Sequence, residues 1–511
     1  MNNNEENKQG IIFGTLSLGL TAIIVKLIGA LYKVPLSYML GDEGMGYFNT
    51  AYTVYGLFYI LCASGLPKGM LMVFNENEQN KGRVVKYSAS LLFAFGSIAS
   101  LLLIGFSPIL CNWLGNSSAV LTLIFIAPSV AFVCGTGVLR GYFNSVLHLQ
   151  PNALSQLIEA LSKLVLGLAF AYVGVKRAFP LYLISSMAVL GITVGSLLSF
   201  VQLSTSAKKL LTKDNIRQKT YIDKKRIAKG ILKYTIPISF GSAILSICGI
   251  IDMKVILNFG IKSGLSQSEA SALYGNYSTL VQPMIALGLA VISPIALSGL
   301  SIMNKHYHKG QNIKFDEALN RVMRITMTLS IPITVMLMIY PLEILDFLFS
   351  REQSIKAAPM LILLAPTLFL LSYQGVLNTA LEAKGKITSS LFSLLIGGCI
   401  KMVLSIIFLF STDLGISGVP LSAIIGDTVG CFISLLLLKP GYQIALGSIP
   451  RIIFSSLIAI ALPKLLLFGN TANSVLFIVN AIISVLIYLI LTAIFELKEL
   501  ITYFKRAKYT K

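Results

Sequence analysis

The feature that most constrains this chain is a series of apolar runs, each about 20 or more residues long, spread over its 511 residues. A helix of about that length crosses the roughly 30 Å hydrocarbon core of a bilayer. The composition agrees, because 55% of the residues are hydrophobic and only 12% are charged, against about 25% charged in soluble domains. In lipid every backbone polar group must be hydrogen-bonded within the protein, which excludes open sheets. The sequence therefore predicts an all-α, polytopic membrane protein.

The apolar runs predict fourteen transmembrane helices, arranged as six, six and two. The first six cover residues 11–40, 48–74, 84–110, 119–143, 151–173 and 179–203. The next six cover 231–259, 271–303, 316–340, 357–382, 387–411 and 415–438, and the last two cover 447–468 and 471–495. We therefore expect four regions, namely an N-lobe (1–203), a basic linker (204–230), a C-lobe (231–438) and a final helix pair with its tail (439–511).

Basic residues outnumber acidic ones, with 41 Lys and Arg against 21 Asp and Glu. The chain has no basic face with interleaved aromatic residues, so nothing indicates nucleic-acid binding. Between residues 204 and 233, ten Lys and Arg stand against Asp214 and Asp223. Cytoplasmic loops of membrane proteins carry an excess of Lys and Arg, and this rule predicts a cytoplasmic linker and two cytoplasmic termini in the cell membrane. The alternative interpretation of the linker is an amphipathic helix on anionic lipid headgroups.

The two lobes share a weak internal repeat. Residues 139–167, laid on the second lobe without gaps, give seven identities, including Lys163 with Lys401. A second, weaker match pairs Pro67 with Pro294. Because both lysine-bearing spans begin on the cytoplasmic side, the repeat predicts two lobes of the same orientation, related by a pseudo-twofold axis along the membrane normal.

Nine ionisable side chains within the predicted spans are candidates for a functional site. They are Lys26, Lys33, Lys68, Glu159, Lys163, Asp252, Lys254, Lys401 and Asp427. Each costs a few kcal/mol in lipid, so they should face a wet interior or one another. Lys26, Lys163 and Lys401 lie about 18 to 23 Å from the cytoplasmic ends of their spans at about 1.5 Å per residue. This common depth near the midplane predicts a cationic chamber that binds the substrate.

Several of these lysines admit another interpretation. Lys33 and Lys254 lie near the outer membrane boundary and Lys68 near the inner one, where a lysine can extend its ammonium group to water. Lys33 and Lys68 are therefore secondary candidates for the chamber. Glu159 and Lys163 are four residues apart and can pair on one helix face. Such a pair would make Lys163 the weakest member of the chamber.

A cationic chamber predicts an anionic cargo, because buried cations are costly without one and lysine suits phosphate. A cation-coupled drug exporter would instead be expected to have an acid at the midplane of its first span, where this chain has Lys26. The candidate coupling acids are Asp252, Asp427 and Glu159. The candidate hinges, where a helix can bend, are Gly65, Pro67 and Pro294.

The sequence contains no GxSxG, HExxH or P-loop motif, so we expect no enzyme activity. The six cysteines are isolated from one another and from the three histidines, so we expect no metal and no cofactor. A non-transporting membrane scaffold stays open as an alternative, although a scaffold would not need lysines at the midplane.

Several segments are similar to one known family. They are KLIGALYKVPLSYMLGDEGMGYFNTAY (26–52), SGLPKGM (64–70), RGYFNS with PNALSQLIEALSK (140–163), LNTALEAKGK (377–386) and GISGVPLSAIIGD (415–427). These segments resemble the stage V sporulation protein B-like polysaccharide exporters. That family belongs with the MurJ-type lipid II flippases in the multidrug/oligosaccharidyl-lipid/polysaccharide exporter superfamily. The resemblance covers essentially the whole chain.

The resemblance implies two six-helix lobes that move an undecaprenyl-linked sugar diphosphate from the inner to the outer leaflet. In the flippase family a cavity base precedes the Leu/Ile-Gly of the first span, and it corresponds here to Lys26. Other cavity arginines of that family fall on Tyr59 and Ser278 here. The last two spans, 447–468 and 471–495, would form a groove for the lipid tail. Membrane lipids and cell-wall synthesis enzymes are the implied partners of a protein that acts as a monomer.

The predicted topology can be tested by labelling single cysteines introduced along the chain. Because basic residues gather in alternate loops, Asn2, Asn215 and Lys511 should be labelled from the cytoplasm, and Gly115 and Asp413 from outside. Finding Asn215 outside would overturn the count of spans.

Overall fold

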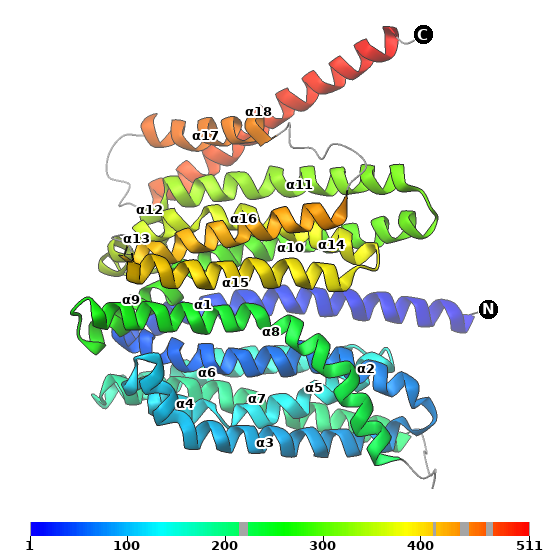
Figure 1. The fold of residues 1–511 in the computed structure, drawn as a ribbon, viewed down its shortest axis with the longest axis vertical. Helices are drawn as coiled ribbons and strands as arrows, with labels where there is room; N and C mark the ends of the chain where they lie inside the picture. Colours follow the sequence, from blue (N-terminus) through cyan, green and yellow to red (C-terminus); the bar gives the residue numbers. More distant parts are fainter. Residues whose placement is uncertain (1, 214–222, 412–414, 440–448, 467–473, 510–511) are drawn as a thin grey trace. The chain divides into compact units, whose positions relative to one another are not determined.

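The computed structural model describes residues 2–213, 223–411, 415–439, 449–466 and 474–509 (Figure 1). Within these ranges the regular elements are α-helices with short 3₁₀ and π-helical turns, and no strand is present. The all-α prediction is confirmed. Contacts between residues divide the chain into two compact units, Met1–Thr279 and Leu280–Lys511. The domain boundaries expected from the sequence stay a prediction.

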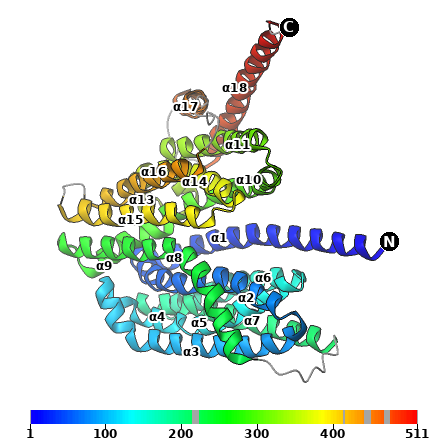
Figure 2. The ribbon, with the colours of Figure 1, turned by 45° about the vertical axis from the view of Figure 1, so that its right-hand side comes forward.

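The first unit contains helices α1 to α9. Their bounds are α1 Asn2–Ile60, α2 Leu66–Glu76, α3 Lys81–Leu114, α4 Val120–Ile126, α5 Ser129–Ser145, α6 Gln150–Lys176, α7 Leu181–Lys213, α8 Lys224–Lys262 and α9 Gln267–Asn276. Helix α1 comprises two helices that meet at Gly41, whose φ of 60° and ψ of −172° are readily adopted only by glycine. The kink therefore lies between the first and second predicted spans. Figure 2 shows α3, α5 and α7 alongside one another, and α5 contacts both of the others.

A π-helical turn interrupts the second predicted span at Leu61–Gly65, immediately before α2. A second π-helical turn, Tyr277–Val281, precedes α10 in the same way. Pro67 follows the first turn and Pro283 the second at the same spacing, two residues after the turn ends. The structure therefore relates Pro67 to Pro283, whereas the sequence match paired it with Pro294, which lies inside α10.

Glycines allow the backbone around the first π-helical turn to approach its neighbours closely. A Cβ atom on Gly65 would lie 2.0 Å from Ser239 Oγ of α8, and one on Gly137 of α5 would lie 2.4 Å from the carbonyl oxygen of Cys62. Close approach of this kind drives helix packing in membranes, where no hydrophobic effect acts between helices. The turn is therefore fixed between α5 and α8.

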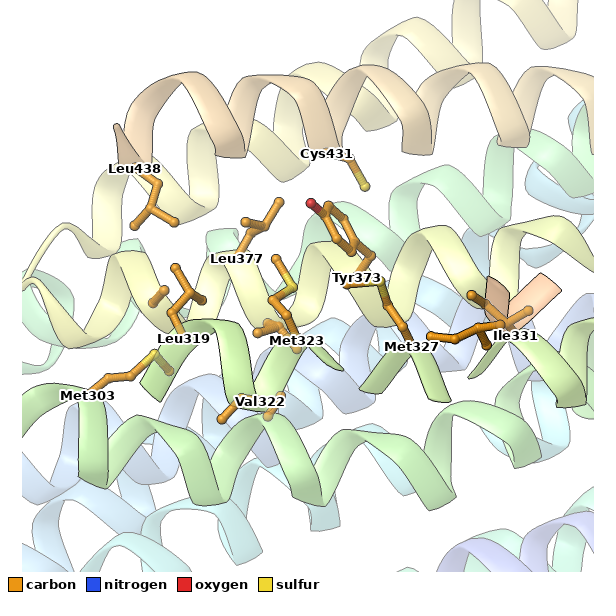
Figure 3. Packing of buried hydrophobic residues seen from close by; sticks show 14 of the residues in the cluster. Met303, Leu319, Val322, Met323, Met327, Ile331, Tyr373, Leu377, Cys431 and Leu438 are labelled. Carbon is orange, nitrogen blue, oxygen red and sulfur yellow. The ribbon is translucent and has the colours of Figure 1, made fainter. Parts of the chain in front are cut away.

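The second unit contains helices α10 to α18. Their bounds are α10 Gln282–His308, α11 Asn312–Ile339, α12 Pro341–Leu348, α13 Arg351–Leu364, α14 Pro366–Ala383, α15 Ile387–Ser411, α16 Gly418–Leu438, α17 Ile449–Leu466 and α18 Ser474–Tyr509. Figure 3 shows the buried side chains at the centre of this unit, such as Met323 and Met327 of α11, Leu377 of α14 and Cys431 of α16. These flexible and branched apolar side chains fill the space between the helices.

The chain is a multi-pass membrane protein. Nine helices in the described ranges are long and apolar enough to cross a bilayer, and the number rises to 11 if each of two bent pairs is one span. The bent pairs are Ser117–Ile126 with Ser129–Ser145, at 41°, and Arg351–Leu364 with Pro366–Ala383, at 42°. All fourteen predicted ranges overlap helices, but the count of fourteen spans stays a prediction.

The close contact at Gly65 predicts that this position tolerates no side chain. In Gly65→Ala the new methyl group would displace Ser239, whose Cα lies 2.6 Å from the Cβ position, at a cost of about 1–3 kcal/mol. Thermal unfolding of the detergent-solubilised protein measures the loss. Gly105→Ala is the matched control, because no atom lies within 4 Å of its Cβ position. Equal melting temperatures for the two variants would contradict the packing described here.

Candidate functional site

A cavity of about 440 Å³ lies within the first unit, among helices α1, α6 and α7. Its lining comprises Val25, Ile28, Gly29, Tyr52, Tyr55, Gly56, Tyr59, Ile60, Gln156, Glu159, Ala160, Lys163 and Ile192. The two halves of α1 both contribute, because the kink at Gly41 turns the helix back along itself. The cavity is thus mostly apolar, with a few convergent polar groups, as is usual for a ligand site.

Lys163 of α6 is held in this cavity by aromatic side chains. Its Nζ donates a hydrogen bond to Tyr52 Oη at 3.1 Å and lies 4.4 Å from the centroid of the Tyr52 ring. The ring of Tyr32 lies on another side, with its centroid 5.1 Å away. Aromatic faces attract an ammonium ion without neutralising it. No carboxylate of the described residues lies within salt-bridge distance of Lys163, so its positive charge is retained.

Glu159, one turn before Lys163, forms an ion pair with Arg140 of α5. Glu159 Oε2 accepts a hydrogen bond from an Arg140 guanidinium nitrogen at 3.1 Å, and both side chains are largely buried. Arg140 also donates to Ser155 Oγ at 3.2 Å and to Ser199 Oγ at 3.5 Å. The interpretation that Glu159 pairs with Lys163 is therefore wrong. Arginine outcompetes lysine here because its planar guanidinium donates to several acceptors at once.

Sequence reasoning did not single out Arg140. The residue lies near the cytoplasmic end of the predicted span 119–143, where a basic side chain is unremarkable because it can reach water. In the structure, however, Arg140 is only 5% exposed. Its position at the start of the segment RGYFNS, one of those that carry the family resemblance, was the available signal.

Three other candidate residues of the first unit, Lys33, Lys68 and Lys254, are not among the residues that line the cavity. Lys33 of α1 donates a hydrogen bond from Nζ to the carbonyl oxygen of Ser278 at 2.7 Å. Lys68 of α2 is exposed, and the ammonium of Lys254 lies 3.4 Å from the Trp113 ring centroid. Exposed lysines and lysines on aromatic rings are common at membrane boundaries.

The four remaining candidates are Asp252, Lys26, Lys401 and Asp427. Asp252 of α8 is buried, at 1% exposure. The side chain of Lys26 lies outside the described residues, although α1 runs through its position. Lys401 of α15 and Asp427 of α16 belong to the second unit, where these two helices pack closely: a Cβ on Gly426 would lie 2.7 Å from Lys401 Cβ. Their roles as chamber base and coupling acid stay predictions.

The described residues thus define a multi-pass, helical membrane protein with a charged cavity among its helices. The chain belongs to the polysaccharide biosynthesis protein family, whose model matches residues 11–298.

Three proteins of Bacillus subtilis (strain 168) are similar in sequence. The uncharacterized membrane protein YabM is 28% identical over 56% of this chain and 54% of its own length. Stage V sporulation protein B is 21% identical over 82% of both chains, and the lipid II flippase MurJ is 21% identical over 78% of this chain and 77% of its own. The match with YabM thus spans about half of that protein.

Two solved structures share the fold. A lipid II flippase MurJ in an inward closed conformation aligns with a TM-score of 0.75 and 19% identity, covering 95% of this chain and 99% of the other. An inward-facing multidrug resistance MATE family transporter of the MOP superfamily aligns with a TM-score of 0.66 and 17% identity, covering 84% of this chain and 97% of the other. At these identities the likeness shows the fold alone.

The ion pair beside the cavity makes a prediction about stability. Arg140→Gln or Glu159→Gln should each destabilise the protein by about 3–5 kcal/mol, because each leaves a buried charge without its partner. The double variant Arg140→Met/Glu159→Leu removes both charges and should recover most of that loss. Thermal unfolding in detergent compares all three variants. Single-variant losses that simply add in the double variant would show that the two side chains are not coupled.

Proposed function

We propose that this protein is an alternating-access flippase for an undecaprenyl-linked sugar diphosphate. The cargo is lipid II or a related polysaccharide precursor, moved from the inner to the outer leaflet for cell-wall, spore-cortex or polysaccharide synthesis. Support comes from the family, from the names of the relatives, and from the shared fold. On this proposal both termini are cytoplasmic, the protein acts as a monomer, and it carries out no catalysis.

The observation that carries the proposal is the charge at the cavity wall. Among the described side chains, Glu159 and Lys163 are the charged residues of the lining, and Arg140 compensates Glu159 at 3.1 Å. The charge of Lys163 therefore remains available to the cargo. A cation within the membrane is costly unless an anion accompanies it, and a diphosphate supplies that anion during passage.

The charge also distinguishes this proposal from the second candidate function, a cation-coupled multidrug exporter. The shared fold of MATE transporters is the observation in favour of that candidate. A cationic drug in the cavity would, however, be repelled by the ammonium group of Lys163. The carboxylate of Glu159 could not compensate the charge of the drug, because it is already paired with Arg140. A phosphate-bearing cargo fits the same wall without repulsion.

An apolar groove in the second unit supports a lipid-linked cargo. It has a volume of about 380 Å³ and is lined by Met336, Phe347, Phe477, Ile478, Ala481, Ile482, Val485 and Leu486 of α11, α12 and α18. We assign the hydrocarbon tail of the cargo to this groove. Helix α17 is fixed nearby by Lys464, whose Nζ lies 3.0 Å from Glu343 Oε1.

The role of Lys163 can be tested with the protein in vesicles that contain a fluorescent undecaprenyl diphosphate-linked sugar. Lys163→Gln should slow flipping about tenfold or more, because a charge-assisted hydrogen bond to phosphate is worth about 1.5–3 kcal/mol. Lys163→Arg should retain more of the rate, since either base binds phosphate. Lys68→Gln is the matched control, because Lys68 is exposed and outside the cavity. A wild-type rate for Lys163→Gln would contradict the electrostatic mechanism.

The groove predicts that the length of the hydrocarbon tail affects the rate of flipping. Ala481→Phe should fill part of the groove and slow the flipping of a long polyprenyl lipid more than that of a short-chain analogue. Removing α17 and α18 is a poorer test, because it would leave the buried Glu343 without Lys464. Equal slowing of the long and the short lipid in the flipping assay would remove the groove from the mechanism.

A further inference from the structure

A stripe of aromatic side chains follows one face of the second half of α1. Phe48, Tyr52, Tyr55 and Tyr59 recur at intervals of four, three and four residues, which places them on one face of a helix. Their ring centroids are 5.7, 6.2 and 5.7 Å apart in that order. The three tyrosines line the cavity that contains Lys163.

A notch in the cavity wall lies beside these tyrosines. Gly56 is four residues after Tyr52 and three before Tyr59, so it is next to both on the helix face. No atom lies within 4 Å of the position that a Cβ on Gly56 would occupy. The same is true of Gly29, which lines the cavity from the first half of α1. A flat ligand can therefore approach the backbone of α1 between the tyrosine rings.

The polar groups of the wall favour one kind of ligand. The hydroxyl of Tyr55 is buried beside Ser196 of α7, and the ammonium of Lys163 contacts Tyr52. A hydrocarbon chain would leave the charge of Lys163 without an anion. A planar aromatic cation would be repelled by Lys163.

We propose that Tyr52, Tyr55 and Tyr59 form a stacking surface for a sugar ring of the cargo, seated over Gly56. A sugar ring has an apolar C–H face and a rim of hydroxyl groups, and a tyrosine offers an aromatic face with a hydroxyl at its end. Lys163, which contacts Tyr52, then binds the adjoining phosphate. This inference rests on the proposed function and deepens it, because it assigns recognition of the glycan to this one face of α1.

The test compares variants that remove the ring, keep the ring or fill the notch. Tyr59→Leu removes the aromatic face and Tyr59→Phe keeps it. Gly56→Leu fills the notch, and Gly105→Leu is its matched control, because Gly105 also has no atom within 4 Å of its Cβ position but lies on α3, outside the cavity. Each protein is placed in vesicles with undecaprenyl diphosphate, either bare or carrying N-acetylglucosamine.

Tyr59→Leu and Gly56→Leu should flip the sugar-bearing lipid about 2- to 10-fold more slowly than wild type, as expected for the loss of one aromatic contact. The bare lipid should be much less affected by both changes. Gly105→Leu should resemble wild type with either lipid, and Tyr59→Phe should flip the sugar-bearing lipid faster than Tyr59→Leu, because it keeps the aromatic ring. Equal slowing of both lipids, or a Tyr59→Phe variant as slow as Tyr59→Leu, would overturn the stacking surface while leaving the proposed function intact.

A wild-type protein that flips neither lipid would instead refute the proposed function. Saturation-transfer NMR of N-acetylglucosamine 1-phosphate with the detergent-solubilised protein then decides the inference by itself. Ring protons of the sugar should receive saturation from wild type and Tyr59→Phe, and much less from Tyr59→Leu and Gly56→Leu. The same saturation from all four proteins, or none from wild type, would overturn the inference.

Discussion

The ion pair between Arg140 and Glu159 sets the charge of the cavity in the first unit. With their charged atoms 3.1 Å apart, the two groups compensate each other, and the carboxylate of Glu159 is not available to Lys163. Lys163 is stabilised instead by the rings of Tyr32 and Tyr52, which leave its positive charge in place. A pair between Glu159 and Lys163 would have left a neutral wall. Under the proposed function, the affinity for an anionic cargo thus depends on an arginine that lies outside the cavity lining.

Close helix packing keeps that arrangement in place. Gly167 and Gly191 allow α6 and α7 to approach until a Cβ on Gly191 would lie 2.3 Å from the backbone nitrogen of Gly167. Glycines in other positions have the opposite effect. Gly29 and Gly56 border open space, so their missing side chains widen the cavity. Glycine thus allows close helix packing at one place and enlarges the cavity at another.

Much of the fold could be predicted from the sequence, because hydropathy reports directly on which segments lie in lipid. The first predicted span ends at residue 40, and the structure kinks at Gly41. The bends inside two predicted spans lie at Pro128 and Pro366, neither of which is among the candidate hinges. Proline is common in straight membrane helices too, so its presence alone does not locate a bend.

The site was less predictable than the fold, because hydropathy reports depth in the membrane and not which face of a helix meets which neighbour. Lys163 was found from its depth, but its partners on α1 are more than a hundred residues away in sequence. Arg140 was overlooked for the same reason, since its contact with Glu159 joins two different helices. Tyr52 and Tyr55 of α1 were not singled out either, because aromatic residues at helical spacing are typical of any packed helix. Tyr59 was named only through the family resemblance.

The central claim is that this protein moves a phosphate-bearing lipid across the membrane, and depleting it from its own cell tests that claim most directly. After depletion, lipid-linked sugars are extracted, identified by mass spectrometry and assigned to a leaflet by their accessibility to an impermeant enzyme. The account predicts that one polyprenyl-linked sugar diphosphate accumulates in the inner leaflet, and that wild-type protein, but not Lys163→Gln, restores its distribution. An unchanged distribution of every lipid-linked sugar between the two leaflets would contradict the account.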